Sequence, residues 1–310
     1  MNSFDRCALT IRTNDDIRLA ATRLGAPHAA VTVVYVHGLL CDSGYWAPVT
    51  EHLHNELDGE LLQITYDQRG HGESGRPHRR TTTTLADLVD DLDAVLAKTA
   101  GETILVSHSA GSLVVAAYAQ RYPQRAAALS GLVFFGATGE FPEFPSLPGR
   151  YRQMPQRLAR FRQTRLDRLA ATAITLAETR FRALSRRLGS KSHLVCGARR
   201  GDPRVLVDML NAYNAFTVVG EEIAALRSVP AFVIAGGRDR VVPASQSVRF
   251  ADKIWADYEL IPDAGHALPH IQPTRAAETI LHAIGVAYRR ERDETAIFRQ
   301  DVPPGSEQAW

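Results

Sequence analysis

Cysteine is scarce in this chain, which has only three in 310 residues. Cys7, Cys41 and Cys196 are odd in number and far apart, so they offer neither a disulfide framework nor the spacing of a metal site. Such usage is typical of a reducing compartment. The chain also lacks an apolar run long enough to span a bilayer, and Met1–Asp16 lacks the apolar region of a signal peptide. We therefore expect a cytoplasmic protein that is not transmembrane.

The formal net charge is only +2, but the charges are unevenly distributed. Between Arg150 and Arg204 there are fifteen basic and three acidic residues, which leaves a net charge of −10 on the rest of the chain. This basic segment is either a solvated helix face or a surface that attracts an anionic partner. Suitable partners are a phosphopantetheine carrier, an acyl-CoA, an acidic lipid surface or a carboxylate substrate. No nucleic-acid-binding motif accompanies the charge, so we expect no nucleic acid as a partner.

Apolar residues make up 45% of the chain and charged residues 23%, a composition unlike that of disordered, collagen-like or coiled-coil proteins. Short β-branched runs alternate with amphipathic helical patterns along most of the sequence. This alternation predicts an α/β protein with a mostly parallel, doubly wound sheet. The predicted strands are Val31–Val36, Leu61–Tyr66, Thr103–Val106, Leu132–Phe135 and Ala231–Ala235, and the predicted helices of this core include Leu85–Ala97 and Ser112–Gln120.

The alternation stops after Gly136 and resumes near Val229. A Pro-rich connector, Phe141–Pro148, opens the interval, and helical spacing then predicts helices over Arg152–Leu188 and Pro203–Val219. We interpret the interval as a helical cap inserted into an α/β core and followed by a loosely ordered polar tail. The expected division is core over residues 1–136, cap over 137–217, core again over 218–290 and polar tail over 291–310.

The segment Val106-Ser107-His108-Ser109-Ala110-Gly111 joins a predicted strand to a predicted helix. Acyl transfer needs a hydroxyl group held clear of the chain, where a base reaches it, and a sharp strand-to-helix turn with small flanking residues provides this. Ser109 is therefore the candidate nucleophile. The same turn places the amide of Ala110 at a helix N-terminus, where a developing oxyanion is stabilised. An ordinary serine in a turn is the alternative interpretation of Ser109.

This segment resembles the G-x-S-x-G elbow of the α/β-hydrolase family, with Ser107 in place of the first glycine. Other segments resemble further motifs of that family and occur in the order that the fold requires. They are His37-Gly38-Leu39-Leu40 for the oxyanion loop, Asp67–Ser74 for the D-x-R-G-x-G-x-S turn, Gly236–Pro243 for the G-x-x-D-x-x-x-P loop and Gly265-His266 for the loop of the base. The resemblance covers the core on both sides of the insertion and implies the α/β-hydrolase fold.

The resemblance implies a role for each matching residue. Ser109 would be the nucleophile, His266 the base that accepts its proton, and Asp239 the acid that orients His266. The backbone amides of Leu39 and Ala110 would form the oxyanion hole. The implied reaction is hydrolysis of a carboxylic ester, or of a lactone or thioester, in a small-molecule acyl substrate without a metal or organic cofactor.

Two other classes of function remain open at this point. One is acyl release or transfer from a carrier or CoA that docks on the basic cap. The other is a non-hydrolytic cyclase, lyase or ligand receptor that uses the same pocket. The sequence gives no indication of an oligomeric state.

Several residues near the motifs have a structural alternative to a catalytic role. We expect His108 to pack sideways, His37 to shape its loop and Cys41 to act as a small buried apolar residue. His270 is an alternative base without a preceding glycine. Asp263 is an alternative acid that lies close to His266 in sequence.

Overall fold

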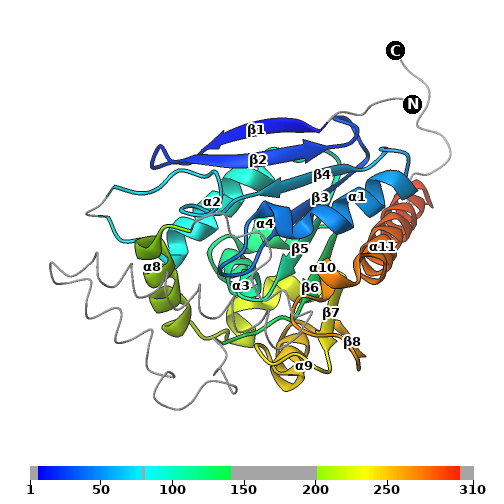
Figure 1. Cartoon of the computed structure of the whole chain (residues 1–310). Helices are drawn as coiled ribbons and strands as arrows, with labels where there is room; N and C mark the ends of the chain where they lie inside the picture. Colours follow the sequence, from blue (N-terminus) through cyan, green and yellow to red (C-terminus); the bar gives the residue numbers. More distant parts are fainter. Residues whose placement is uncertain (1–5, 79–80, 141–200, 301–310) are drawn as a thin grey trace, which may run out of the picture.

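A computed structural model of the chain describes residues 6–78, 81–140 and 201–300 (Figure 1). Within them, eight strands form one sheet in the order β1-β2-β4-β3-β5-β6-β7-β8. The pairs β1–β2 and β2–β4 are antiparallel and all other neighbours are parallel, which confirms the predicted mostly parallel sheet. The strands are β1 (Cys7–Arg12), β2 (Arg18–Leu24), β3 (Val31–Val36), β4 (Leu62–Tyr66), β5 (Glu102–His108), β6 (Gly131–Phe135), β7 (Ala231–Gly236) and β8 (Asp257–Ile261).

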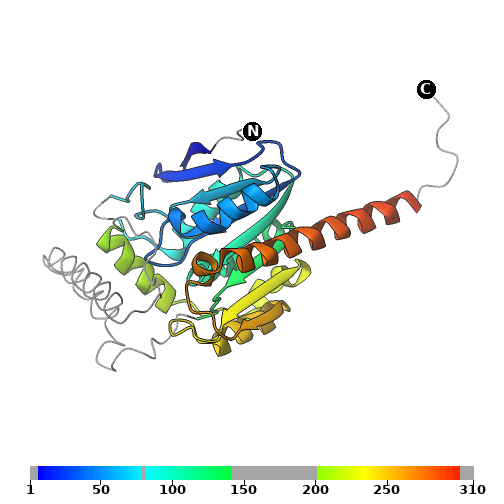
Figure 2. The ribbon, with the colours of Figure 1, turned by 45° about the vertical axis from the view of Figure 1, so that its right-hand side comes forward.

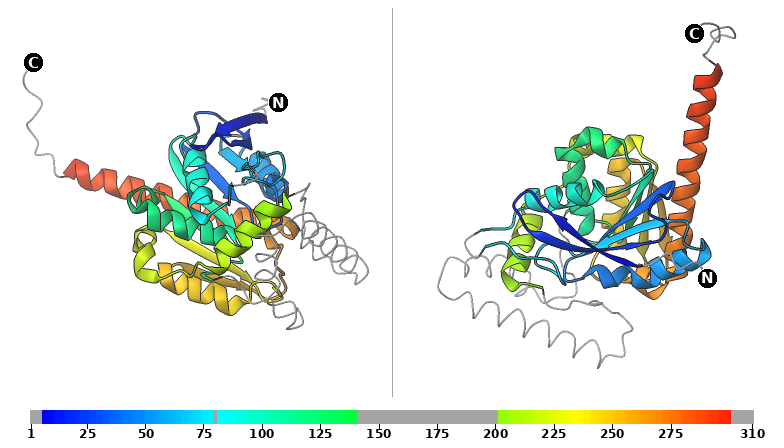
Figure 3. Two further views of the ribbon diagram at one scale, coloured as in Figure 1. Left: turned by 90° about the vertical axis from the view of Figure 1, so that its left-hand side faces the viewer. Right: turned by 90° about the horizontal axis from the view of Figure 1, so that it is seen from above.

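Helices cover both faces of this sheet, so the predicted doubly wound arrangement is also confirmed (Figures 1 and 3). Helices α1 and α11 pack on one face, and α2, α3 and α9 pack on the other. The α-helices are α1 (Ala47–Glu56), α2 (Leu85–Leu96), α3 (Gly111–Arg121), α4 (Pro123–Ala127), α8 (Pro203–Asn214), α9 (Ala244–Ile254), α10 (Leu268–Ile271) and α11 (Pro273–Gln300), with 3-10 helices η1 (Ser43–Trp46) and η2 (Gly220–Ser228).

The continuous apolar runs of the central strands follow from these two helical layers. In β6, Leu132 and Phe134 belong to the core under α2, α3 and α9, whereas Val133 and Phe135 belong to the core under α1 and α11. Successive side chains of a strand point to opposite faces, so a strand covered on both sides must be apolar at every position. These buried strands fix the loops that follow their carboxyl ends.

The chain segment between β6 and β7 begins and ends at residues that are hydrogen-bonded to each other. The amide of Val218 donates to the carbonyl of Gly139 at 2.7 Å, and Glu140 forms an antiparallel bridge with Thr217. Helix α8 ends at Asn214, before the predicted end at Val219. The predicted helix Arg152–Leu188 and the connector before it lie outside the described residues.

Several further elements differ from the sequence predictions. The antiparallel pair β1–β2 and the edge strand β8 were not predicted, because their side chains are alternately exposed and buried or mostly exposed rather than uniformly apolar. Helix α11 continues to Gln300, so the first part of the predicted loose tail is helical. Figure 2 shows this part of α11 running out beyond the sheet. No helix in residues 6–78, 81–140 and 201–300 is both long and apolar enough to cross a membrane.

Candidate active site

Ser109 lies in a strained turn between β5 and α3. Its φ is +54°, in the left-handed region that residues with a side chain rarely adopt. The amide of Ser109 donates to the carbonyl of Phe135 at 3.0 Å, and its carbonyl accepts from the hydroxyl of Ser112 at 2.7 Å. Ser112 also donates to the carbonyl of Thr138 at 2.9 Å. The hydroxyl of Ser109 is thus carried on a backbone that is fixed from both sides, as the elbow motif predicts.

The loops that carry Asp239 and His266 run in direct contact after β7 and β8. A Cβ atom on Gly236 would lie 2.5 Å from the carbonyl oxygen of Ala264, and one on Gly237 would lie 2.6 Å from that of Pro262. Only glycine fits such an approach. The two glycines before Asp239 therefore allow its loop to lie against the loop of His266.

The structure brings Asp239 and His266 together. His266 Nδ1 lies 2.8 Å from Oδ2 of Asp239, and the two side chains are 10% and 1% exposed. The other carboxylate oxygen of Asp239 accepts from the amides of Val241 and Val242 at 2.8 and 2.9 Å. With all its oxygens engaged as acceptors, Asp239 requires the Nδ1–H tautomer of His266, which leaves a lone pair on Nε2 for a proton.

This pair lies next to the elbow. A Cβ atom built on Gly136 would be 3.3 Å from Oδ2 of Asp239 and 3.6 Å from Nδ1 of His266. Gly136 follows Phe135, the residue that accepts the amide hydrogen bond of Ser109. The predicted acid, base and nucleophile therefore follow the ends of β7, β8 and β5, around the end of β6.

The amides of Leu39 and Ala110 both belong to the loops beside Ser109. Ala110 is the N-cap of α3, and Leu39 precedes Leu40, which has a φ of +63°. In the part of the chain that the structure describes, neither amide donates a hydrogen bond to the protein. Two unengaged amides at a helix N-terminus and in an adjoining loop can receive a developing oxyanion.

His37 shapes the predicted oxyanion loop by hydrogen bonds. Its Nε2 accepts from the amide of Gln68 at 3.0 Å, and its Nδ1 lies 2.8 Å from the carbonyl of Gly38. Burial lowers the pKa of His37 below its usual value, so the ring is neutral and carries its proton on Nδ1. The predicted structural role of His37 agrees with these contacts.

The alternative acid and base have other positions. Asp263 is exposed, and His270 Nδ1 lies 3.0 Å from the carbonyl of Tyr45. Cys41 is buried. His108 is fully buried, and its Nε2 lies 2.8 Å from the carbonyl of His266. Sequence reasoning missed this contact and that of Ser112, since neither residue carries a signal beyond its place beside the elbow.

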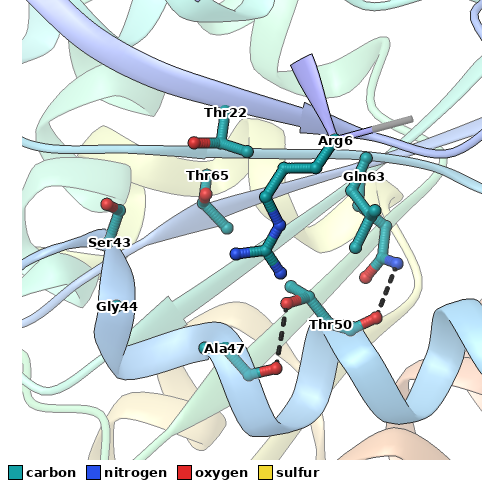
Figure 4. A pocket seen from close by; sticks show the side chains of 9 residues that line it. Arg6, Thr22, Ser43, Gly44, Ala47, Thr50, Gln63 and Thr65 are labelled. Carbon is teal, nitrogen blue, oxygen red and sulfur yellow. Dashed lines mark hydrogen bonds between the residues drawn. The ribbon is translucent and has the colours of Figure 1, made fainter. Parts of the chain in front are cut away.

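A small polar hollow lies apart from these residues, beside the N-terminal end of α1 (Figure 4). Its volume is about 60 Å³, and none of the predicted catalytic residues lines it. The guanidinium of Arg6 lies in it and pairs with Glu51 at 3.2 Å. Thr50 and Gln63 are tied to each other by a hydrogen bond of 3.0 Å from the amide of Gln63. Each of these polar side chains is already engaged in an ion pair or a hydrogen bond, so we assign no function to the hollow.

Comparison with known proteins gives a consistent match over the core. A family model described as serine aminopeptidase, S33, matches residues 27–270. A monoacylglycerol lipase of Mycolicibacterium smegmatis is 26% identical over 236 residues, which are 72% of this chain and 75% of the lipase.

A dihydrolipoyllysine-residue acetyltransferase component of an acetoin cleaving system, from Pseudomonas putida, is 27% identical over 244 residues. The match covers 76% of this chain but only 58% of that protein. Among solved structures, a thermophilic esterase from Thermogutta terrifontis superposes with a TM-score of 0.67 at 23% identity, over 91% of this chain and 99% of the esterase. At that identity the superposition establishes the fold alone.

Proposed function

The chain belongs to the serine aminopeptidase S33 family of α/β hydrolases, and from this membership we propose that it hydrolyses carboxylic esters through an acyl-enzyme on Ser109. The proposal is supported chiefly by the hydrogen bond of 2.8 Å between His266 and the buried Asp239, beside the strained turn of Ser109. Buried carboxylates are stable only with such partners, and this one leaves His266 ready to act as a base.

In the first half of the reaction, the Ser109 oxygen attacks the ester carbonyl while His266 Nε2 accepts the hydroxyl proton. The carboxylate of Asp239 stabilises the imidazolium that results. The carbonyl oxygen becomes negatively charged and accepts hydrogen bonds from the amides of Leu39 and Ala110. When the carbonyl reforms, the bond to the alcohol oxygen breaks, and His266 returns its proton to the leaving alcohol.

In the second half, water takes the place of the alcohol. His266 removes a proton from the water as its oxygen attacks the acyl carbon, and the same two amides hold the second oxyanion. Collapse breaks the bond to Ser109, which recovers the proton from His266. The products are a carboxylic acid and the regenerated serine. A lactone or thioester would react in the same way, with an internal hydroxyl or a thiol as leaving group.

A fluorophosphonate probe tests the nucleophile directly. We expect the probe to label Ser109 and turnover of short p-nitrophenyl esters to fall by a factor of roughly 10³ or more in Ser109→Ala. Peptide mass spectrometry locates the adduct, and initial rates give turnover. A folded Ser109→Ala variant that kept the rate would exclude the acyl-enzyme and favour a non-hydrolytic function of the same pocket.

The role of Asp239 has its own test. Asp239→Asn keeps the shape of the side chain but offers an N–H group to His266, which favours the wrong tautomer. We expect kcat to fall by a factor of roughly 10⁴ with little change in KM, measured as initial rates on the same esters. If kcat stayed within a factor of ten, another acid would have to orient His266, and the exposed Asp263 would be the next candidate for substitution.

The basic segment supports a second candidate function. Fifteen basic residues between Arg150 and Arg204, against three acidic ones, would attract an acyl substrate bound to an anionic carrier or CoA. All of these basic residues except Arg204 lie outside the described residues, and the cap remains a proposal. In this case turnover of acyl-CoA should decline steeply with added salt while turnover of a neutral ester does not. Equal salt dependence for both substrates would leave the basic segment without a role in substrate attraction.

A further inference from the structure

The ring of His108 fills the space between the two loops that would carry out the chemistry. On one side its Nε2 lies 2.8 Å from the carbonyl oxygen of His266, and the two ring centroids are 4.6 Å apart. On another side Tyr45 stacks on it, with centroids 4.5 Å apart and ring planes inclined by 21°. A Cβ atom on Gly38 would lie 2.9 Å from Nδ1 of His108. The residue before the predicted nucleophile thus contacts both the oxyanion loop and the loop of the base.

The protonation state of His108 follows from these contacts. Burial, reinforced by the neighbouring His266, lowers the pKa of His108 far below its usual value, so the ring is neutral. A neutral imidazole has one N–H group, and a carbonyl oxygen can only accept. Because Nε2 faces the carbonyl of His266, the proton lies on Nε2. The Nδ1 atom, which faces Gly38, has no hydrogen-bond partner among the described residues.

On the basis of the function proposed above, we infer that His108 is a positioning residue whose Nε2–H group holds the main chain of His266 and thereby sets the base relative to Ser109. The two residues are 158 positions apart in sequence, yet His108 is bonded directly to Ser109 through the chain. The contact therefore ties the base to the turn of the nucleophile itself. No backbone amide within the described residues donates to the carbonyl of His266.

Asp239 alone does not fix the base in this way. Its hydrogen bond at 2.8 Å constrains one ring nitrogen of His266 but leaves the ring free to tilt about that contact. A second bond to the backbone of the same residue removes much of this freedom. Displacement of a catalytic group by about 1 Å lowers a rate by as much as 100-fold, so even a modest loss of restraint should be measurable.

Two substitutions separate the hydrogen bond from the packing. His108→Phe keeps an aromatic ring beside Tyr45 but removes the donor. His108→Gln loses the ring but carries an amide nitrogen the same number of bonds from the backbone as Nε2, so it can restore the donor. His282→Phe is the control for loss of a histidine, because His282 lies on α11 and meets Phe232 edge-on at 5.1 Å.

We expect kcat for a p-nitrophenyl ester to fall by roughly 10- to 100-fold in His108→Phe with KM unchanged. The rate of fluorophosphonate labelling of Ser109 should fall by the same factor, and His108→Gln should recover most of both losses. The downfield proton resonance of His266 Nδ1–H in its hydrogen bond with Asp239 should broaden or move in His108→Phe and return in His108→Gln. A loss of packing alone would not be repaired by glutamine.

The wild-type enzyme provides a measurement that does not depend on a variant folding. Nitrogen-15 spectra of the histidine rings should show His108 as the neutral Nε2–H tautomer from pH 6 to 8. The Nδ1–H tautomer would overturn the inference. So would an unchanged kcat together with an unchanged His266 resonance in His108→Phe.

A Ser109→Ala control distinguishes failure of the inference from failure of the proposed function. If this variant still hydrolysed the ester, the acyl-enzyme would be excluded, and the resonance and tautomer measurements would still decide the role of His108.

Discussion

The backbone of Ser109 is held in a conformation that its side chain disfavours. A non-glycine residue at a φ of +54° costs roughly 1 kcal/mol relative to an ordinary conformation. The hydrogen bonds from Ser112 and to Phe135 keep the residue there. A sharp turn of this kind is expected to hold a hydroxyl clear of the flanking strand and helix, so the strain lies where the proposed chemistry needs the nucleophile.

Replacing Ser109 with glycine should therefore raise the free energy of unfolding while abolishing esterase activity. We expect Ser109→Gly to be about 1 kcal/mol more stable than Ser109→Ala, because only glycine adopts the left-handed region without strain. Urea denaturation of the two variants, followed by circular dichroism, gives the difference. Equal stability of the pair would mean that the turn relaxes once the serine is gone.

For single residues, the sequence indicates the side chains that would react but not the side chains that position them. Ser109, Asp239 and His266 each stand in a motif whose spacing is local, and the structure brings the last two into contact. The contact between His108 and His266 depends on how the β5 and β8 loops meet in space, and nothing in the residues flanking His108 encodes it.

At the scale of the elements, the turn after β4 is held in place by a buried arginine side chain, that of Arg69. The guanidinium of Arg69 is 2% exposed and makes two hydrogen bonds of 2.7 Å to Asp91 of α2. It also donates at 2.8 Å to Asp15, in the turn between β1 and β2. Arg69 thus joins a loop, a helix and a hairpin, and the resemblance of its turn to a family motif reflects this scaffold role.

Arg69→Met should lower the free energy of unfolding by roughly 3–5 kcal/mol, because the carboxylate of Asp91 would stay buried without a partner. The double variant Arg69→Met/Asp91→Asn should recover part of that loss, since the amide is uncharged. Denaturant titration of the three proteins measures both effects. A loss below 1 kcal/mol in the single variant would show that water reaches Asp91 when arginine is absent.

The sequence predicts elements well where both faces are buried. The runs over β3, β4, β5, β6 and β7 are mostly apolar, and the predicted bounds lie within two residues of those observed. Strands β1 and β2 form an antiparallel hairpin at the sheet edge, and β8 is the opposite edge. Their mixed side chains give no uniform apolar signal, so pairing with the neighbouring strand, and not composition, determines that they form.

For the molecule as a whole, buried neutral histidines make stability depend on pH. Burial lowers the pKa values of His37 and His108, and burial together with repulsion from His37 lowers that of His71 to about 3. The unfolded chain binds protons at these rings near pH 6.5, but the folded chain does not. Their contribution to stability is therefore complete above pH 6.5 and is lost as the pH falls below it.

We expect the free energy of unfolding to decline from pH 6.5 to pH 5 by up to about 1.4 kcal/mol per pH unit for each histidine. Asp91 acts in the opposite direction below pH 6, because burial raises its pKa to about 6 and the folded state then binds its proton first. Urea titrations at several pH values measure the net slope, which should become shallower in His71→Asn. A stability that rose on acidification would contradict the assignment of neutral buried rings.

The bridge between Glu140 and Thr217 also has a consequence for how the molecule can be altered by recombination or design. Because the chain leaves the sheet and returns to it at adjacent points, the core meets the whole intervening segment as one closed loop with a fixed attachment geometry. The free energy of closing a loop changes slowly with its length, so segments of very different size can be grafted between these two positions. Helix α8 lies within this segment and contributes Val205, Met209 and Tyr213 to the core, so a graft should keep these buried side chains.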